Sequence, residues 1–300
     1  MDLTSANLEI LFKGLKTNFQ QGFESLGDDG AVWEMYSTVV PSTTAVEIYP
    51  WLKTLPRMRE WIGDRVLHSL EGADFSIKNR KFELTEGVER DRIEDDTFGL
   101  YGPVFNEFGR VSREHPNELT VEVLESNPIC YDGQPLFDAD HPVLDASGEE
   151  ISKSNDMGGA GPAWYVMDLS RVIRPIIFQR RRDYDFRQIT DLNDSKVFMT
   201  DKFVFGVDAR VNAGPGLWQL VVRSKQAFNA ANYEAARQRL TSLKGDYERP
   251  LGLRHTHTMV PNTLEGLARK VLSNSLAAGG ETNEWAGTSQ LILHPWMATA

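Results

Sequence analysis

Apolar residues recur at steps of three and four near the start of the chain and predict an amphipathic helix. The periodic positions are Leu8, Leu11, Phe12, Leu15, Phe19 and Phe23, and such spacing places them on one helical face. Thr4 or Ser5 is suited to cap the first turn. From residue 31 to residue 50 the chain is rich in Ser, Thr and Val and contains Pro41, which favours extended backbone. We therefore expect a helical arm followed by an extended segment.

Alternation replaces the helical period between residues 65 and 92 and predicts a long two-stranded hairpin. One strand is expected over 65–77 and the other over 82–92, with a polar turn at Lys78, Asn79 and Arg80. In the second strand, apolar positions alternate with charged ones. A hairpin that projects in this way is costly to leave uncovered. The pattern is typical of a building block rather than of an enzyme.

Helical spacing returns after this hairpin. Asp95 or Asp96 is suited to cap a helix with an aromatic stripe, which consists of Phe98, Tyr101, Phe105 and Phe108. Pro116 interrupts the pattern, and it resumes at Leu119, Val123 and Leu124, so we expect a long, broken helix. Aromatic stripes at this spacing belong to the hydrophobic core far more often than to a cofactor site.

The second half of the chain reads as mixed α/β, after a stretch that carries few signals. Residues 127–201 include the Pro- and Gly-rich run GGAGPAW at 158–164, which is typical of contact-making loops. Two strands are expected over 202–210 and 217–223, joined across residues 212–216. Later elements are a helix over 232–243, a strand over 255–260, a helix over 263–276 and a strand over 290–294. The fold class is therefore α+β.

Composition describes a globular chain of 300 residues, 41% hydrophobic and 25% charged, which is enough for one large or two modest cores. The first residues have neither the basic start nor the apolar stretch of a signal peptide. No run approaches the roughly 18 apolar residues of a membrane span, and we expect synthesis in the cytosol. Cys130 is the single cysteine, so no intramolecular disulfide can form.

Charge is distributed unevenly along the chain. Residues 1–150 hold 13 Lys and Arg against 29 Asp and Glu, whereas residues 151–300 hold 19 against 14. One half of a copy can therefore attract the other half of another copy, unless both are simply solvated. The net charge of −11 argues against general binding of nucleic acid. The basic run Arg180, Arg181 and Arg182 is short and is followed by acidic residues, and it faces either DNA or a neighbouring subunit.

Motifs for catalysis are weak. The chain contains no GxxxxGK phosphate loop and no GxSxG nucleophile elbow. His255 and His257 lie two residues apart on an expected strand, where a metal pair is far rarer than ordinary histidines. Glu94, Asp95 and Asp96 are explained by stabilisation of a helix start.

The strongest chemical candidate is the segment YDGQPLFDADHP at 131–142. It places Asp138, Asp140 and His141 within four residues, a set able to bind a divalent cation or to act as acid and base. The alternative, which we favour, is a turn in which the aspartates bind backbone N–H groups. The sequence thus predicts no catalytic, cofactor-binding or metal-binding residue.

Several motifs together resemble one family. They are WIGDR at 61–65, NRKFELTEGVERDRIEDD at 79–96, GLYGPVFNEFGR at 99–110, YDGQPLFDADHP at 131–142, GVDAR at 206–210, GLWQL at 216–220 and LKGDYERPLGL at 243–253. In this order they are similar to the major head subunits of Mu-like bacteriophages and prophages. The resemblance runs over nearly the whole chain, and 143–163, 183–197 and the residues after Pro295 lack a matching pattern.

The resemblance implies the tailed-phage capsid fold named after phage Hong Kong ninety-seven. Its parts would be an N-terminal arm at 1–49, an extended loop at 50–86, a peripheral domain with a spine helix at 87–127, and an α/β axial domain at 128–300, with a possible return strand to the peripheral domain. Some members of this fold join a loop lysine to a neighbour's asparagine. Lys78 and Lys81 would be the candidates here, although this branch is expected to lack that bond.

The implied function is self-assembly into an icosahedral shell around double-stranded DNA, with the arm and the loop reaching over neighbours. Pentamers and hexamers of identical subunits, together with scaffold, protease and portal proteins, would be the partners. The protein would reside in the virion, and in the host cytoplasm during assembly. Two alternatives stay open: a nanocompartment of the same fold that encloses cargo enzymes, and an α/β enzyme that uses Asp138, Asp140 and His141.

Overall fold

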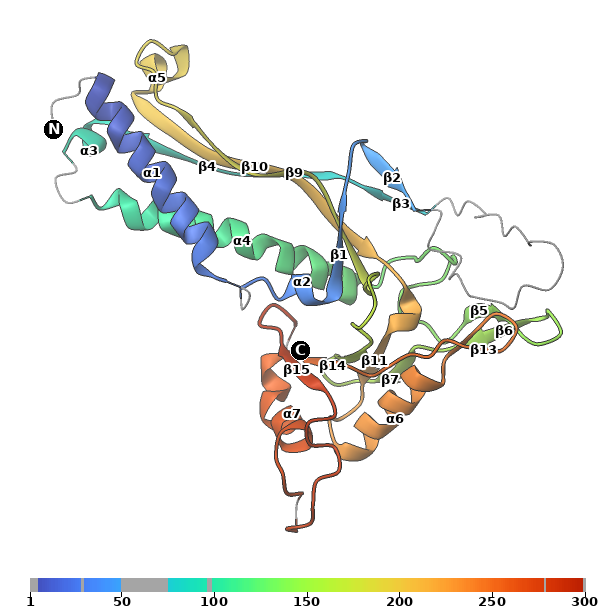
Figure 1. Ribbon diagram of the computed structural model, residues 1–300. Coiled ribbons are helices and arrows are strands. Elements are labelled where there is room, and N and C mark those ends of the chain that lie inside the picture. Colours follow the sequence, from blue (N-terminus) through green and yellow to red (C-terminus); the bar gives the residue numbers. More distant parts are fainter. Residues whose placement is uncertain (1–4, 28–29, 50–74, 96–98, 278, 299–300) are drawn as a thin grey trace.

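The molecule is elongated, with a helix-backed sheet at one end and a mixed α/β body at the other (Figure 1). The computed structural model describes residues 5–27, 30–49, 75–95, 99–277 and 279–298. Two long strands leave the α/β body and run to the far end of the sheet (Figure 1). The two ends are therefore joined by continuous backbone rather than by a flexible linker.

Two helices cover one face of the long sheet, as the apolar periodicity predicts. They are α1 (Ser5–Ser25) and α4 (Tyr101–Ser126). At their crossing, a Cβ added to Gly22 would lie 1.8 Å from the backbone oxygen of Asn106, and one added to Gly109 would lie 2.0 Å from the backbone oxygen of Phe19. Only glycine permits this approach at both positions. The helix α1, which belongs to the arm expected to reach over neighbours, is therefore packed against its own subunit.

The long sheet has the strand order β1-β9-β10-β4. Its strands are β1 (Ser37–Pro41), β9 (Ile176–Ile189), β10 (Lys202–Pro215) and β4 (Arg80–Glu89). Alternate residues of β10 are buried, which gives the sheet one face toward the helices and one face away from them. An aromatic cluster fills the space between the sheet and the helices, formed by Phe12, Phe19, Phe105, Phe108, Phe186, Phe203 and Phe205. A short helix, α5 (Ser195–Thr200), lies at the tip between β9 and β10.

The α/β body contains a second sheet in the order β15-β14-β8-β11-β7. Its strands are β7 (Asp156–Gly159), β8 (Trp164–Met167), β11 (Val221–Lys225), β14 (His257–Val260) and β15 (Gln290–Leu293). The helices of this body are α6 (Ala230–Ser242) and α7 (Glu265–Leu272), the latter preceded by a 3-10 turn, Asn262–Leu264. Strand β8 is buried along its whole length and lies at the centre of the sheet.

Smaller elements complete the described chain. They are α2 (Trp33–Tyr36), α3 (Arg90–Glu94), the strand pairs β2 (Val46–Ile48) with β3 (Ser76–Lys78), β5 (His141–Leu144) with β6 (Glu150–Lys153) and β12 (Lys244–Gly245) with β13 (Arg249–Pro250), and a 3-10 turn at Trp218–Leu220. The single cysteine, Cys130, is buried, and burial raises the pKa of its thiol.

The expected hairpin over 65–92 is wrong in the part that the structure describes. β3 pairs with β2, and β4 pairs antiparallel with β10 from Arg80 to Glu89. Asn79 links β3 to β4 without a hairpin turn and is buried, where its side chain donates to Ser42 Oγ at 2.8 Å. The alternation was correctly recognised, but its partner strand lies more than a hundred residues away. Residues 65–74 of the expected first strand lie outside the described ranges.

The expected break at Pro116 is also wrong, because α4 runs unbroken through it. Proline inside a helix costs about 3 kcal/mol relative to alanine, and burial of Pro116 and of the residues that follow it offsets that cost. The adjacent Asn117 is fully buried, and its side chain accepts a hydrogen bond from Trp33 N and donates one to Gly30 O. Asp95 ends α3 rather than beginning a helix, and Asp96 and Phe98 lie outside the described residues.

Two further differences concern the second half of the chain. β10 continues to Pro215 and belongs to the long sheet, whereas β11 belongs to the sheet of the α/β body, so the two do not pair. The stretch expected to consist of loops holds β5 to β8 and the 14-residue β9. Two long strands, β9 and β10, therefore connect the α/β body to the far end of the long sheet.

Candidate assembly surfaces

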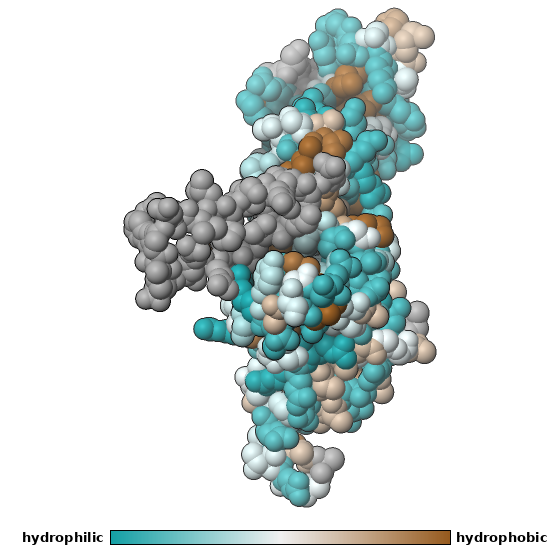
Figure 2. Space-filling model, turned by 90° about the vertical axis from the view of Figure 1, so that its right-hand side faces the viewer, coloured by the Kyte–Doolittle hydropathy of each residue, from teal (hydrophilic) through white to brown (hydrophobic). Residues whose placement is uncertain are grey.

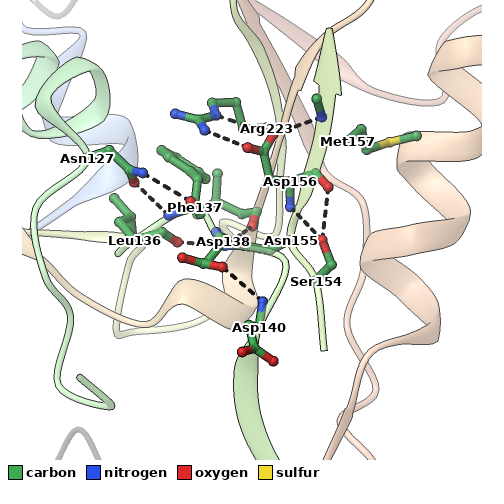
Figure 3. A network of polar contacts seen from close by, with 12 residues as sticks. Asn127, Leu136, Phe137, Asp138, Asp140, Ser154, Asn155, Asp156, Met157 and Arg223 are labelled. Atoms are coloured by element: carbon green, nitrogen blue, oxygen red, sulfur yellow. Dashed lines mark hydrogen bonds and ion pairs between the residues drawn. The ribbon is translucent and has the colours of Figure 1, made fainter. Parts of the chain in front are cut away.

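Asp138 and Asp140 belong to a turn that is held by side-chain hydrogen bonds. The Oδ1 atom of Asp138 accepts a hydrogen bond from the backbone N–H of Asp140 at 3.0 Å, and the carboxylate of Asp140 accepts one from the Ser152 hydroxyl. Figure 3 shows the Asp140 carboxylate directed away from that of Asp138. These are the contacts of an aspartate turn.

His141 lies apart from both aspartates in its interactions. The side chain is fully buried and stacks on Trp218, with ring centroids 3.9 Å apart. Its Nδ1 atom lies 2.6 Å from Asp132 Oδ2, and its Nε2 atom lies 3.2 Å from Asn155 Oδ1. The side chains of Asp138, Asp140 and His141 therefore do not contact one another, although the backbone N–H of Asp138 and the His141 ring both contact Asn155 Oδ1. This geometry favours the structural alternative for this segment.

Asn155 organises this region, and nothing in the sequence marks it. Its side chain is fully buried, and its Oδ1 atom accepts a hydrogen bond from Asp138 N at 3.0 Å. Its Nδ2 atom donates to three backbone carbonyls, those of Leu136, Trp218 and Val221. Figure 3 shows Asn155 between the loop and the start of β7. This one amide satisfies backbone groups from segments far apart in the chain.

His255 and His257 have separate partners too. His255 precedes β14 and is buried, with Nε2 lying 3.1 Å from Thr258 Oγ1. Burial, assisted by the charge of Arg237, lowers the pKa of His255 to about 4. The Nδ1 atom of His257 lies 2.8 Å from Thr256 Oγ1. Within the described ranges, no group of three or more His, Cys, Asp or Glu residues is placed to hold a metal ion.

A buried polar network fastens the N-terminal segment to the long helix and to the last strand. The hydroxyl of Tyr36 lies 2.7 Å from Thr120 Oγ1 on α4 and 2.8 Å from Nε2 of His294, which follows β15. His294 is fully buried, and its Nδ1 atom has no hydrogen-bond partner among the described residues. Burial lowers the pKa of His294 to about 4, so the neutral ring is the form that the fold accommodates.

The basic run lies on β9 and is interleaved with carboxylates. Arg180 Nη1 lies 3.0 Å from Asp183 Oδ2, and Arg182 forms an ion pair with Asp208 of β10. Arg181 is exposed. The run is therefore not the continuous cationic track that a phosphate backbone requires. Lys78 ends β3 and Lys81 lies in β4, and the expected lack of a covalent bond at these lysines stays a prediction.

Two adjacent large apolar side chains are exposed at the tip of the long sheet. On α5 at the sheet tip, Phe198 is 80% exposed and Met199 is 78% exposed. Val172 and Ile48 are exposed elsewhere. The face seen in Figure 2 is mostly hydrophilic, with separate small hydrophobic spots. Adjacent exposed apolar residues on a projecting tip are typical of a contact surface. No described helix is long and apolar enough to cross a bilayer.

Solved phage shells contain subunits of this architecture. The chain is similar to a subunit of the procapsid of bacteriophage JBD30, at 36% identity over 98% of this chain and 100% of that chain, with a TM-score of 0.84. It is also similar to the JBD30 capsid subunit, at 28% identity over 89% of this chain and 90% of that chain, with a TM-score of 0.76. The fold is that of tailed-phage capsid proteins, the α+β fold named after phage Hong Kong ninety-seven.

Sequence comparison specifies the family. The family model for the Mu-like prophage major head subunit gpT matches residues 8–297. The chain is 36% identical to the major capsid protein of Escherichia phage Mu, over 99% of this chain and all of that protein. It is 39% identical to the Mu-like prophage FluMu major head subunit of Haemophilus influenzae, over 92% of each. The chain belongs to the family of Mu-like major head subunits, and the resemblance expected from the motifs is confirmed.

Proposed function

We propose that copies of this chain close into an icosahedral shell of pentamers and hexamers around double-stranded phage DNA. The observation that carries the proposal is the likeness of nearly the whole chain to a procapsid subunit, with a TM-score of 0.84. The elongated outline and the exposed residues Phe198 and Met199 at its tip also support it. In such a shell many small contacts add up, because each is repeated by symmetry.

The negative net charge of the chain is compatible with a shell that encloses DNA. A net charge of −11 makes the wall repel packaged DNA on average, so that DNA can move during filling. We infer that scaffold, protease and portal proteins assist assembly in the host cytoplasm, and that the finished shell resides in the virion.

We also infer a division of labour along the chain. Residues 1–49 would serve as the arm, 50–86 as the extended loop, 87–127 as the peripheral domain and 128–300 as the axial domain. The pairing of β9 with β10 and of β10 with β4 supports assigning β9 and β10 to the peripheral part. The packing of α1 against α4 limits any reach of the arm over a neighbour to a state in which that packing is released.

Electron microscopy and size-exclusion chromatography of the purified chain test the proposal. We expect rings, tubes or closed shells, and shells recovered from phage-producing cells should protect double-stranded DNA from nuclease. A monomer or dimer that assembles under no salt condition would overturn the assembly proposal. Shells that contain cargo enzymes instead of DNA would favour the nanocompartment. An activity abolished by Asp140→Ala in a discrete oligomer would favour the enzyme.

A further inference from the structure

Two neighbouring rows of charged residues, here called rungs, run across the strands on the face of the long sheet that points away from α1 and α4. Within each rung all charges have the same sign. Each rung contains one residue from β9, one from β10 and one from β4, which are cross-strand partners. The basic rung consists of Arg182, Arg210 and Lys81, and the acidic rung consists of Asp185, Asp208 and Glu83. The rungs lie two residues apart along β10, a separation of roughly 7 Å.

This arrangement leaves cations without partners in the single subunit. Like charges directly opposite each other in a sheet are destabilising. Arg182 is neutralised by Asp208, but Arg210 and Lys81 form no ion pair with any residue that the structure describes. The Nε atom of Arg210 is moreover buried and lacks a hydrogen-bond partner. A buried donor without an acceptor is rare and calls for an explanation.

The carboxylates of the acidic rung are also not fully used as hydrogen-bond acceptors and ion-pair partners within the subunit. Arg187 Nε lies 3.3 Å from Asp208 Oδ1, yet this oxygen is buried and accepts no hydrogen bond. The charges of Arg187 and Asp208 therefore lie close together, but their geometry is not that of a hydrogen bond. Glu83 receives a hydrogen bond from Thr85 and forms no ion pair with a described residue.

The chain covers the adjacent part of this face with its own strand β3. Asn212, two residues along β10 from Arg210, donates through Nδ2 to Lys78 O at 2.8 Å. Gln179 is fully buried on β9 and donates through Nε2 to Ile77 O at 3.2 Å. Strand β3 therefore covers this face of the sheet as far as Asn212. The basic rung lies directly beside the covered part, on the same face.

We propose that the basic rung receives a carboxylate from a second copy of this chain, so that this sheet face is a contact between subunits. The inference deepens the proposed function and rests on it. A carboxylate between Lys81 and Arg210 would neutralise both cations and offer an acceptor to the buried Nε. Each copy supplies such groups in excess, with 43 Asp and Glu against 32 Lys and Arg.

A protein segment fits this face better than DNA does. The acidic rung begins one step from the basic rung and repels a phosphate backbone laid across both. A segment with an acid and a base can place each over the rung of opposite sign, which also fixes its register.

Two substitutions, Lys81→Gln and Arg210→Gln, test the inference by separating assembly from subunit stability. Each should raise the subunit concentration at half-assembly by about threefold, the size typical of an exposed ion pair. The unfolding midpoint of the unassembled subunit should stay unchanged or rise, since each variant relieves repulsion between like charges. Lys202→Gln is the matched control, because Lys202 lies opposite Glu89 in a rung of mixed charge on the same two strands and should not alter assembly.

The outcomes are distinguishable from failure of the proposed function. If the unsubstituted chain forms shells and both variants assemble as it does, this inference alone is wrong. A loss of assembly matched by an equal loss of subunit stability would also overturn it, because the rung would then act within the fold. Since Arg210 is partly buried, Lys81→Gln decides the matter if Arg210→Gln fails to fold.

Zero-length crosslinking identifies the partner directly. Shells assembled from equal amounts of nitrogen-14 and nitrogen-15 subunits are treated with a carbodiimide, which joins an amine to a carboxyl group as an amide with loss of water. We expect peptides in which Lys81 of one isotope is joined to an Asp or Glu of the other. Crosslinks of Lys81 only within one copy, or loss of DNA binding by shells of the Lys81→Gln variant in a filter assay, would overturn the inference, the latter in favour of a phosphate ligand.

Discussion

Replacing Gly109 by alanine measures how closely α1 must approach α4. The new Cβ atom would lie 2.0 Å from Phe19 O and 2.5 Å from Phe23 N. Both are backbone atoms, so no side-chain rotation relieves the clash, and the helices must separate. Strain of this kind costs typically 1–3 kcal/mol, and the absence of a flexible neighbour places this site near 3. Alanine returns about 1 kcal/mol of helix propensity, which leaves a net loss of about 2 kcal/mol.

Separation of the helices should be preferred to complete release of α1. Release would expose Phe12, Leu15 and Phe19, which are at most 7% exposed in the structure. At roughly 1.5–3 kcal/mol for each buried side chain, this costs about 5–9 kcal/mol. We therefore expect α1 to stay bound in the Gly109→Ala variant, with hydrogen exchange in α1 faster than in the unsubstituted chain but slower than in an unfolded segment.

Urea unfolding of the unassembled subunit provides the measurement, and Gly14→Ala provides the control. Gly14 lies in α1, the other helix of this pair, with nothing within 4 Å of an added Cβ, so that variant should gain about 0.5–1 kcal/mol from propensity alone. The two variants should thus shift in opposite directions. If Gly109→Ala matched Gly14→Ala in stability, the close crossing inferred here would be refuted.

Three further outcomes are expected in the α/β body and its buried networks. Asn155→Ala should lower the free energy of unfolding by about 2–4 kcal/mol, because several buried backbone groups lose their partner; a loss below 1 kcal/mol in urea unfolding would contradict that role. Asp132→Asn removes the carboxylate beside the buried His141 and should cost about 2 kcal/mol, the size of a lost hydrogen bond to a charged group, whereas Asp140→Asn should change thermal stability little, and equal effects would argue against the separate roles assigned to the two aspartates. The pKa of His294 lies at about 4, below its ordinary value of 6.5, so as pH falls from 6.5 toward 4 the unfolded chain binds a proton that the folded chain does not. Unfolding free energy should therefore decline across that window by up to about 3 kcal/mol, and a decline that is equally steep in His294→Gln would exclude this histidine as a cause.

Local periodicity was sufficient for the two long helices, because each buries one face against the sheet, but the short helices α2, α3 and α5 were not predicted. The expected arm helix corresponds to α1, and the stripe through Phe105 and Phe108 identified α4. Periodicity could not foresee that α4 passes through Pro116, since the stabilising contacts of Asn117 come from residues 84 and 87 positions earlier. Tertiary packing overrode a local preference.

Strand pairing was the part least accessible from sequence. β4 alternates as predicted, but its partner β10 is specified by burial across the whole molecule, not by a nearby turn. β9 escaped notice because it has a shift of register against β10 around Asp208 and Arg210, which disrupts simple alternation. Central strand β8 is apolar throughout and carries no period. Asn155 was missed for a related reason: a buried amide that bonds to distant carbonyls has no local pattern.

The direction in which β9 and β10 run bears on how a filled head resists bursting. In the proposed shell, confined DNA would push outward, and the curved wall would turn that pressure into tension between neighbouring subunits. The two strands are bonded over most of their length and both connect the α/β body to the sheet tip, so a pull between those ends is carried by the continuous backbone of both strands. The hydrogen bonds between β9 and β10 would bear the load only if the pull ran across the ladder, where they would fail one at a time.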